Sequence, residues 1–229
     1  MELAIDSSNE VASVALSSEG ALVAELTWRS GQNHTAELAP GIIRVLNQAG
    51  LGLGELGGLI VARGPGSFNG IRVAMSVAKG LALALKLPLV GVGTLEIVAY
   101  PYRGLGLPVC PVMAMARGEL AAAVYEVRKG EWVRTVEESI FSVESLVGEL
   151  GSRTLLCGEI PADTLSLLKR SLGRKALVLR DGAGVRRAGY LAELGWRKLR
   201  RGEFDPSPTL QPLYLRRPSI TTSQKAVGR

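Results

Sequence analysis

The fold is decided by residues 58–72, which read GLIVARGPGSFNGIR. The five residues at 58–62 form a short apolar run and predict a buried strand. The Gly-Pro-Gly triplet at 64–66 then predicts a sharp turn, because glycine and proline both favour turn conformations. Ser67 is a residue type that caps helices, and a helix is expected from Asn69 to Leu85. This strand–turn–helix unit is typical of an α/β fold.

Further strands and helices are predicted on both sides of this unit. Before it, alternating apolar residues predict strands over residues 1–6, 11–16 and 21–28, and helical spacing predicts a helix over 34–49. After it, an apolar run at 89–92 predicts one more buried strand. The first part of the chain thus has several strands first and alternating helices and strands afterwards.

The same order of elements returns in the second half of the chain. After a Gly- and Pro-rich linker at 101–108, strands come first again, and helices and strands then alternate up to about residue 201. We therefore expect two lobes, over residues 1–100 and 101–229, each with a mixed sheet. This duplicated pattern is typical of the two-lobed actin/Hsp70/sugar-kinase-like (ASKHA) fold, in which the first hairpin of each half holds nucleotide phosphates.

The composition is that of a globular protein with a sizeable core. The 229 residues are 47% hydrophobic and 21% charged. Cys110 and Cys157 both lie in apolar, strand-like segments, which favours two buried, reduced thiols in the cytoplasm over a disulfide framework. The apolar run at 73–92 is interrupted by two lysines and a proline, so no membrane association is expected.

Positive charge is concentrated late in the chain. The net charge is +6, and the basic residues of this region include Lys169, Arg170, Arg174, Lys175, Arg186, Arg187, Arg197, Lys198, Arg200 and Arg201. Such a cluster attracts RNA, but it is equally typical of a solvated helix face. Aromatic residues that would stack on bases are not interleaved with it, which favours the solvated face.

Two short segments resemble phosphate-binding turns. Asp6, Ser7 and Ser8 end the first strand, where an acidic residue can orient a hydrated metal and small residues let the backbone approach a phosphate. The alternative is a turn closed by its own side chains. Residues 181–184, Asp-Gly-Ala-Gly, precede the last predicted helix and are interpreted as its cap rather than as a phosphate loop.

No catalytic site is predicted from the residues themselves. His34 is the only histidine, and no activated nucleophile or second metal ligand accompanies it in the sequence. A hydrogen-bonding role at the start of the helix over 34–49 is the preferred interpretation. We therefore expect no catalytic residue, no metal and no cofactor.

The helix over 69–85 is apolar around most of its circumference, which predicts burial on two sides. Small residues form one ridge, with Val73, Val77 and Leu81 beside it, and this side is expected to cover the protein's own sheet. The roughly opposite side is expected to meet a partner protein, together with part of the helix over 34–49. The residues predicted for this partner interface are Phe68, Ile71, Arg72, Met75, Leu38 and Ile42.

These segments together resemble the TsaB (YeaZ) family, whose members are partner subunits in bacterial tRNA modification. The resemblance covers most of residues 3–99 and is weak afterwards. It rests on Leu3-Ala4-Ile5-Asp6-Ser7-Ser8, on His34 with Leu38 and Pro40, on Arg63-Gly64-Pro65-Gly66-Ser67-Phe68-Asn69-Gly70-Ile71-Arg72, on Ala78-Lys79-Gly80-Leu81-Ala82, on Pro88-Leu89-Val90-Gly91-Val92 with Leu95-Glu96, and on Pro212-Leu213-Tyr214-Leu215-Arg216. The chain departs from the family pattern at Met115, where an acidic residue is usual, and at Asn69, where threonine is common.

The resemblance implies an ASKHA fold without catalysis of its own. It implies a scaffold subunit that binds the transferase TsaD, with the ATPase TsaE, and supports threonylcarbamoyl transfer to the adenosine beside the tRNA anticodon. TsaD carries paired histidine metal ligands where this chain has Thr94 and Val98. Alone, the chain is expected to form a homodimer, and tRNA is expected to be met only through the complex. The alternatives are an ASKHA-type nucleotide-binding or peptidase-like enzyme and an RNA-binding module.

Overall fold

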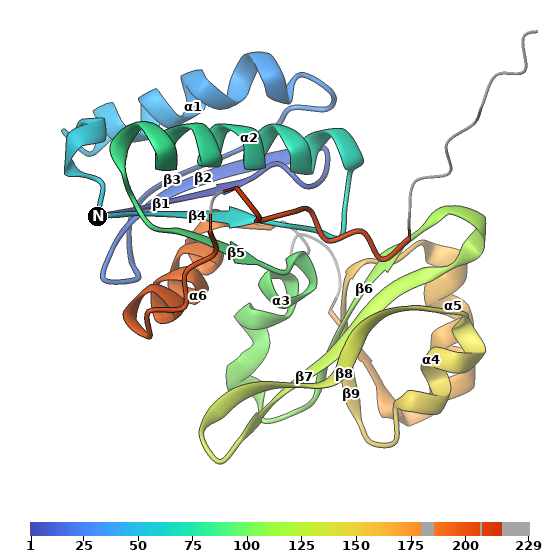
Figure 1. Ribbon diagram of the computed structural model, residues 1–229. Coiled ribbons are helices and arrows are strands. Elements are labelled where there is room, and N and C mark those ends of the chain that lie inside the picture. The colour runs from blue at the N-terminus through green and yellow to red at the C-terminus, as the bar shows by residue number, and fades with distance from the viewer. Residues whose placement is uncertain (180–185, 207, 217–229) are drawn as a thin grey trace, which may run out of the picture.

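The computed structural model describes residues 1–179, 186–206 and 208–216 and consists of two lobes, each built on a five-stranded mixed sheet (Figure 1). The Asp-Gly-Ala-Gly segment at 181–184 lies outside the described residues. The first sheet has the order β3-β2-β1-β4-β5 and the second β10-β9-β6-β7-β8. In both sheets an antiparallel hairpin is joined to parallel strands, so the predicted duplication and the ASKHA fold are confirmed.

The elements of the first half follow the predicted order. They are β1 (Glu2–Asp6), β2 (Val11–Ser18), β3 (Ala21–Arg29), α1 (His34–Gln48), the 3₁₀ helix η1 (Leu53–Glu55), β4 (Gly58–Ala62), α2 (Phe68–Leu85), β5 (Leu89–Val92) and α3 (Thr94–Ala99). Helices α1 and α2 cover one face of the first sheet (Figure 1).

The second half begins with a 3₁₀ helix, η2 (Tyr100–Leu105), in the segment predicted as a linker. The remaining elements are β6 (Val109–Ala114), η3 (Ala116–Gly118), β7 (Leu120–Arg128), β8 (Glu131–Phe141), α4 (Val143–Glu149), β9 (Thr154–Glu159), α5 (Ala162–Leu172), η4 (Gly173–Lys175), β10 (Ala176–Val178) and α6 (Ala188–Arg200). Helices α4 and α5 pack on one face of the second sheet.

The expected division of the chain at residue 100 does not hold for α6. This helix packs on the free face of the first sheet, opposite α1 and α2, through Leu191, Ala192 and Leu194 (Figure 1). The segment after α6 also returns to the first lobe. Asp205 accepts a hydrogen bond from the Gly91 amide at 2.8 Å, and Leu210 lies in the first core, the hydrophobic cluster between the first sheet and α1 and α2. The first lobe is therefore completed by residues from the end of the chain.

The orientation of α2 differs from the sequence prediction. Its sheet-facing side is centred on Ala74 and Ala78, but Ile71 and Met75 are also buried there, 0% and 3% exposed. Val73 and Val77 are only half-buried. The predicted partner face was therefore wrong at Ile71 and Met75, because an almost wholly apolar helix has no polar side to set its rotation.

The predicted partner residues of α1 also require correction. Leu38 and Ile42 are 1% and 4% exposed and pack in the first core, so neither can meet a partner. His34 is the buried first residue of α1, and its Nδ1 atom has no hydrogen-bond partner among the described residues. The hydrogen-bonding role expected for His34 is therefore not observed at Nδ1.

The cysteines and the apolar helix behave as parts of a folded core. Cys110 and Cys157 are buried and free, as predicted, and burial raises the pKa of the Cys110 thiol to about 12. Among the described residues, α2 alone is long and apolar enough to cross a membrane by length and composition. Its packing on the first sheet identifies it as a core helix.

Candidate functional site

The Asp6-Ser7-Ser8 hairpin lies against the start of α2. The Ser7 hydroxyl donates to the Gly70 carbonyl at 2.8 Å, and the Ser67 amide donates to the Ser8 carbonyl at 2.7 Å. A side chain on Gly70 would collide with the carbonyl oxygen of Ser7, so this close approach requires glycine. Gly70 therefore allows the start of α2 to pack directly against the hairpin.

Ser67 caps α2, as the sequence predicts. Its side-chain oxygen accepts a hydrogen bond from the Gly70 amide at 3.3 Å. Gly64 and Pro65 are buried before it, and the Gly64 carbonyl accepts a hydrogen bond from the Thr94 amide at 2.8 Å. The 64–67 turn thus joins the hairpin, α2 and α3.

Hydrogen bonds within the hairpin occupy one of the two carboxylate oxygens of Asp6. Oδ1 of Asp6 accepts hydrogen bonds from the Ser8 amide at 2.8 Å and from the Ser8 hydroxyl at 2.5 Å. This is the turn closed by its own side chains that formed the alternative to phosphate binding. The other carboxylate oxygen, Oδ2, has no direct hydrogen bond to any described residue.

Arg186 provides the positive charge that faces this oxygen. Its side chain is 2% exposed, its Nε lies 3.8 Å from Asp6 Oδ2, and its Nη2 lies 3.5 Å from Glu159 Oε1 in the second lobe. A guanidinium therefore stands beside the carboxylate that would orient a hydrated metal in a phosphate-binding hairpin. Because a buried carboxylate requires a compensating charge, Arg186 serves as an internal cation between the lobes.

The structure contains no arrangement typical of a hydrolytic metal site among the described residues. No group of three or more His, Cys, Asp and Glu side chains comes together there that could hold a metal ion. Thr94 is buried, and its hydroxyl lies 3.5 Å from the Ser8 hydroxyl. Val98 packs in the core of the second lobe.

An apolar surface remains on the outer side of α1 and α2, which pack against each other. Leu83 is 79% exposed and Ile43 is 57% exposed. We call the outer face the set of exposed or half-buried apolar and small positions on these two helices, namely Pro40, Ile43, Val73, Val77, Gly80, Leu83 and Ala84. The side of α2 that its periodicity predicted for a partner does not coincide with these positions.

Two predicted interface residues do stay at the surface. Phe68 is 38% exposed and stacks on Tyr214, with ring centroids 5.3 Å apart. The guanidinium carbon of Arg72 lies 3.9 Å from the Phe68 ring centroid, and its Nε donates to the Tyr214 hydroxyl at 3.2 Å. Both residues therefore hold the C-terminal segment against α2 in the folded chain.

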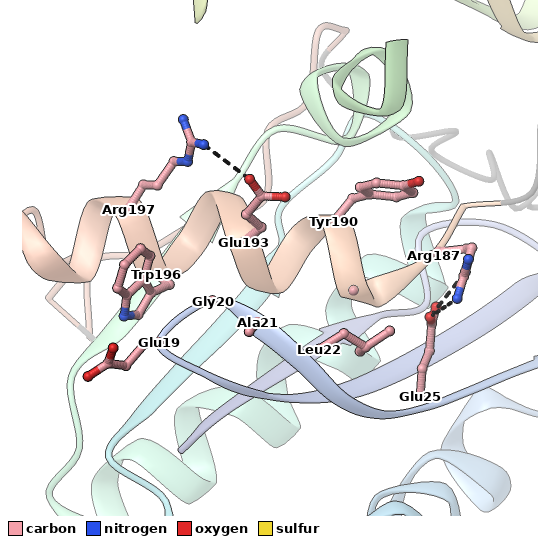
Figure 2. A pocket seen from close by; sticks show the side chains of 11 residues that line it. Glu19, Gly20, Ala21, Leu22, Glu25, Arg187, Tyr190, Glu193, Trp196 and Arg197 are labelled. Carbon is pink, nitrogen blue, oxygen red and sulfur yellow. Dashed lines mark hydrogen bonds and ion pairs between the residues drawn. The ribbon is translucent and has the colours of Figure 1, made fainter. Parts of the chain in front are cut away.

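A separate hollow of about 460 Å³ lies between the β2–β3 hairpin and α6 (Figure 2). Trp196 and Tyr190 form part of its wall. Its charged side chains are largely paired within the protein, since Arg187 contacts Glu25 at 2.7 Å. This hollow could not be predicted from the sequence, because its two walls are about 170 residues apart in the chain.

The chain matches a family model described as TsaD, tRNA N6-adenosine threonylcarbamoyltransferase, over residues 23–159. Among curated proteins, it is 28% identical to the tRNA threonylcarbamoyladenosine biosynthesis protein TsaB of Bacillus subtilis, over 93% of each chain. It is 31% identical to TsaB of Escherichia coli, over 93% of this chain and 94% of that protein.

The solved structures agree with these sequence relationships. YeaZ from Pseudomonas aeruginosa superposes with a TM-score of 0.79 at 27% identity, over 93% of this chain and 99% of that one. A ROK hexokinase from Thermus thermophilus has a TM-score of 0.50 at 12% identity, over 87% and 99% of the two chains, and supports the ASKHA fold alone. The chain therefore belongs to the TsaB (YeaZ) family and has a role in tRNA threonylcarbamoyladenosine biosynthesis.

Proposed function

We propose that this chain is a non-catalytic subunit that binds a TsaD-type transferase through the outer face of α1 and α2. In this role it supports threonylcarbamoyl transfer to the adenosine beside the tRNA anticodon, and TsaE joins the same assembly. The observation that carries the proposal is the exposure of Leu83 and Ile43 side chains on two adjoining helices. Fully burying a leucine or isoleucine is worth about 1.5–3 kcal/mol, so an uncovered pair favours a partner.

The lack of catalysis is proposed from the hairpin between the lobes. A metal held by Asp6 would have to displace Arg186, whose guanidinium already faces Oδ2 from 3.8 Å. Two cations cannot share this buried position without strong repulsion. This contact favours the scaffold over the alternative of an ASKHA-type nucleotide-binding or peptidase-like enzyme.

The same outer face explains the homodimer expected of the isolated chain. A self-complementary dimer would cover the apolar surface that TsaD covers in the complex. The two buried, free cysteines favour a cytoplasmic location, and we expect neither a cofactor nor membrane contact.

The test is a titration of Leu83→Asp and Ile43→Asp variants against purified TsaD. A carboxylate buried without a partner costs several kcal/mol, and each 1.4 kcal/mol is tenfold in affinity, so binding should weaken by at least about a hundredfold. Leu22→Asp is the matched control, because Leu22 is a 48% exposed leucine on β3, away from α1 and α2.

Wild-type affinity in both outer-face variants would show that TsaD binds elsewhere. Light scattering on the same proteins tests the dimer: the wild type should be dimeric and Leu83→Asp monomeric. A wild type that stays monomeric at micromolar concentration would exclude self-association through this face.

A further inference from the structure

The late positive charges of the sequence separate into distinct groups in the structure. Those on and before α6 are mostly paired or buried: Arg187 contacts Glu25 at 2.7 Å and Arg197 contacts Glu193 at 3.1 Å (Figure 2). Arg186 is buried between the lobes. The cluster seen in the sequence is therefore not one continuous basic surface.

A second group stays together at one end of the second lobe. Strands β6, β9 and β10 are parallel, and α5 connects the end of β9 to the start of β10. The end of α5 therefore lies at the same end of the sheet as the starts of β9 and β10. Five exposed cations lie there, and we call them the basic end: Arg153, Lys169, Arg170, Arg174 and Lys175.

The two segments of the basic end are in contact, and none of its charges is neutralised by an ion pair among the described residues. Lys175 Nζ donates to the Gly151 carbonyl at 3.1 Å, which joins η4 to the turn before β9. None of the five cations forms an ion pair with a described residue. Glu144 and Asp163 lie in the first turns of α4 and α5, at the other end of the sheet. Glu149 at the end of α4 and Glu126 near the end of β7 lie closer to the basic end, and Glu126 is paired with Arg128.

Stabilisation of the helix end accounts for only part of this cluster. Lys169 and Arg170 in the last turn of α5 complement the helix dipole. Arg153 lies outside any helix, and Arg174 and Lys175 lie beyond the end of α5 in the three-residue η4. Three of the five are arginines, whose planar guanidinium groups bind phosphate oxygens in pairs.

We propose that the basic end binds the phosphate backbone of structured RNA. That the RNA is tRNA rests on the proposed function and on the relatives named for tRNA threonylcarbamoyladenosine biosynthesis. No described aromatic residue lies among the five cations, so contact is made with the backbone rather than with bases.

The position of the basic end leaves the outer face free. The opposite end of the second sheet, where the parallel strands finish, faces the first lobe. Glu159 at the end of β9 contacts Asn9 there. The basic end therefore points away from the first lobe, at the lower right of Figure 1, while α1 and α2 lie on the far side of that lobe. One subunit can thus hold TsaD and an RNA backbone at the same time.

The test measures fluorescence anisotropy of a labelled tRNA transcript with the isolated full chain, from about 50 to about 200 mM salt. The triple variant Arg153→Gln, Arg170→Gln, Arg174→Gln is compared with Arg29→Gln, Arg197→Gln, Arg201→Gln. The control removes the same charge from exposed arginines that lie elsewhere on the protein and have ion-pair partners there. Exposed ion pairs contribute little to stability, so both variants should fold.

Each phosphate contact contributes about 0.7–0.9 to the slope of log K against log salt, so the first variant should lower the slope by about 2 to 3. Its affinity at the lowest salt should fall at least tenfold more than that of the control. Equal losses in both variants, or no measurable RNA binding by the wild type at low salt, would overturn the proposal. Binding to anionic vesicles but not to tRNA, with the same dependence on the variants, would assign the surface to lipid instead.

Two further measurements separate this proposal from the proposed function. The basic-end variant should bind TsaD with wild-type affinity, whereas Leu83→Asp should lose TsaD and keep its affinity for tRNA. Loss of both activities in the basic-end variant, with an unchanged melting temperature, would contradict the assignment of two independent surfaces.

Discussion

The rotation of α2 can be tested by replacing Met75, which the structure buries, and Leu83, which it exposes. Met75 is 3% exposed in the first core, and Leu83 is 79% exposed on the same helix two turns later. Replacement of each by aspartate introduces the same charge into two very different environments. The pair therefore reports which side of the helix faces the sheet.

The cost of Met75→Asp has two parts. The loss of a buried methionine side chain removes about 1.5–3 kcal/mol of hydrophobic stabilisation. A carboxylate without a partner in an apolar core adds several kcal/mol more. The sum, about 5 kcal/mol or above, is comparable with the total stability of many domains, about 5–15 kcal/mol.

Thermal melts and urea titrations measure this cost directly. For a protein of this size, 1 kcal/mol corresponds to about 2–4 °C, so Met75→Asp should lower Tm by at least about 10 °C or prevent folding. Met75→Leu, which keeps the volume, should cost less than about 1.5 kcal/mol. Leu83→Asp should melt within a few degrees of the wild type.

Two outcomes would refute the assigned rotation. A Met75→Asp protein with the wild-type melting curve would mean that this side chain does not lie in the core. A Leu83→Asp protein that unfolds, beside a stable Met75→Asp protein, would mean that the two sides of α2 are reversed.

Four further predictions concern the interior. Arg186→Met should destabilise the chain by about 3–5 kcal/mol in urea titrations because it leaves Asp6 unpaired, and Asp6→Asn in the same chain should recover much of this loss; additive effects would exclude the ion pair. Gly70→Ala should lower Tm, since the added methyl group meets the hairpin backbone; an unchanged Tm would show that α2 and the hairpin are not in close contact. Burial raises the pKa of the Glu96 carboxyl, so its ionised form costs stability at pH 7; Glu96→Gln should therefore melt higher at pH 7, and this gain should disappear below about pH 4.5, the ordinary pKa of glutamate. The Cys110 thiol, with a pKa of about 12, should not react with a thiol reagent at pH 8 until the protein unfolds, and rapid labelling of the native chain would contradict its burial.

Much of the fold can be predicted from the sequence because it depends on local chemistry. The apolar run at 58–62, the turn at 64–66 and the cap at Ser67 act within a few residues of one another, and each lies where it was predicted. The strand-first order of both halves likewise follows from side-chain alternation, which has the same period in any strand. These features determined the ASKHA fold and, with their residue identities, the family.

The rotation of α2 could be decided only by the tertiary structure. Its residues are apolar or small around most of the circumference, so several rotations bury a similar area. The hairpin selects one of them, because Gly70 must lie against Ser7 for the two segments to approach. This contact joins residues 63 positions apart and is invisible to any local pattern.

The remaining parts of the candidate surfaces also depend on long-range contacts. Arg186 meets Asp6 across 180 positions of sequence. The basic residues near the end of the chain form two groups: those of α6, which have ion-pair partners, and those of the basic end, which have none. A sequence shows which charges a chain carries, but ion pairing depends on distances of a few ångströms that are set when the two lobes fold together. The residue types were therefore determined by the sequence alone, whereas the tertiary structure decided which side chains pair with one another and which stay exposed at the surface.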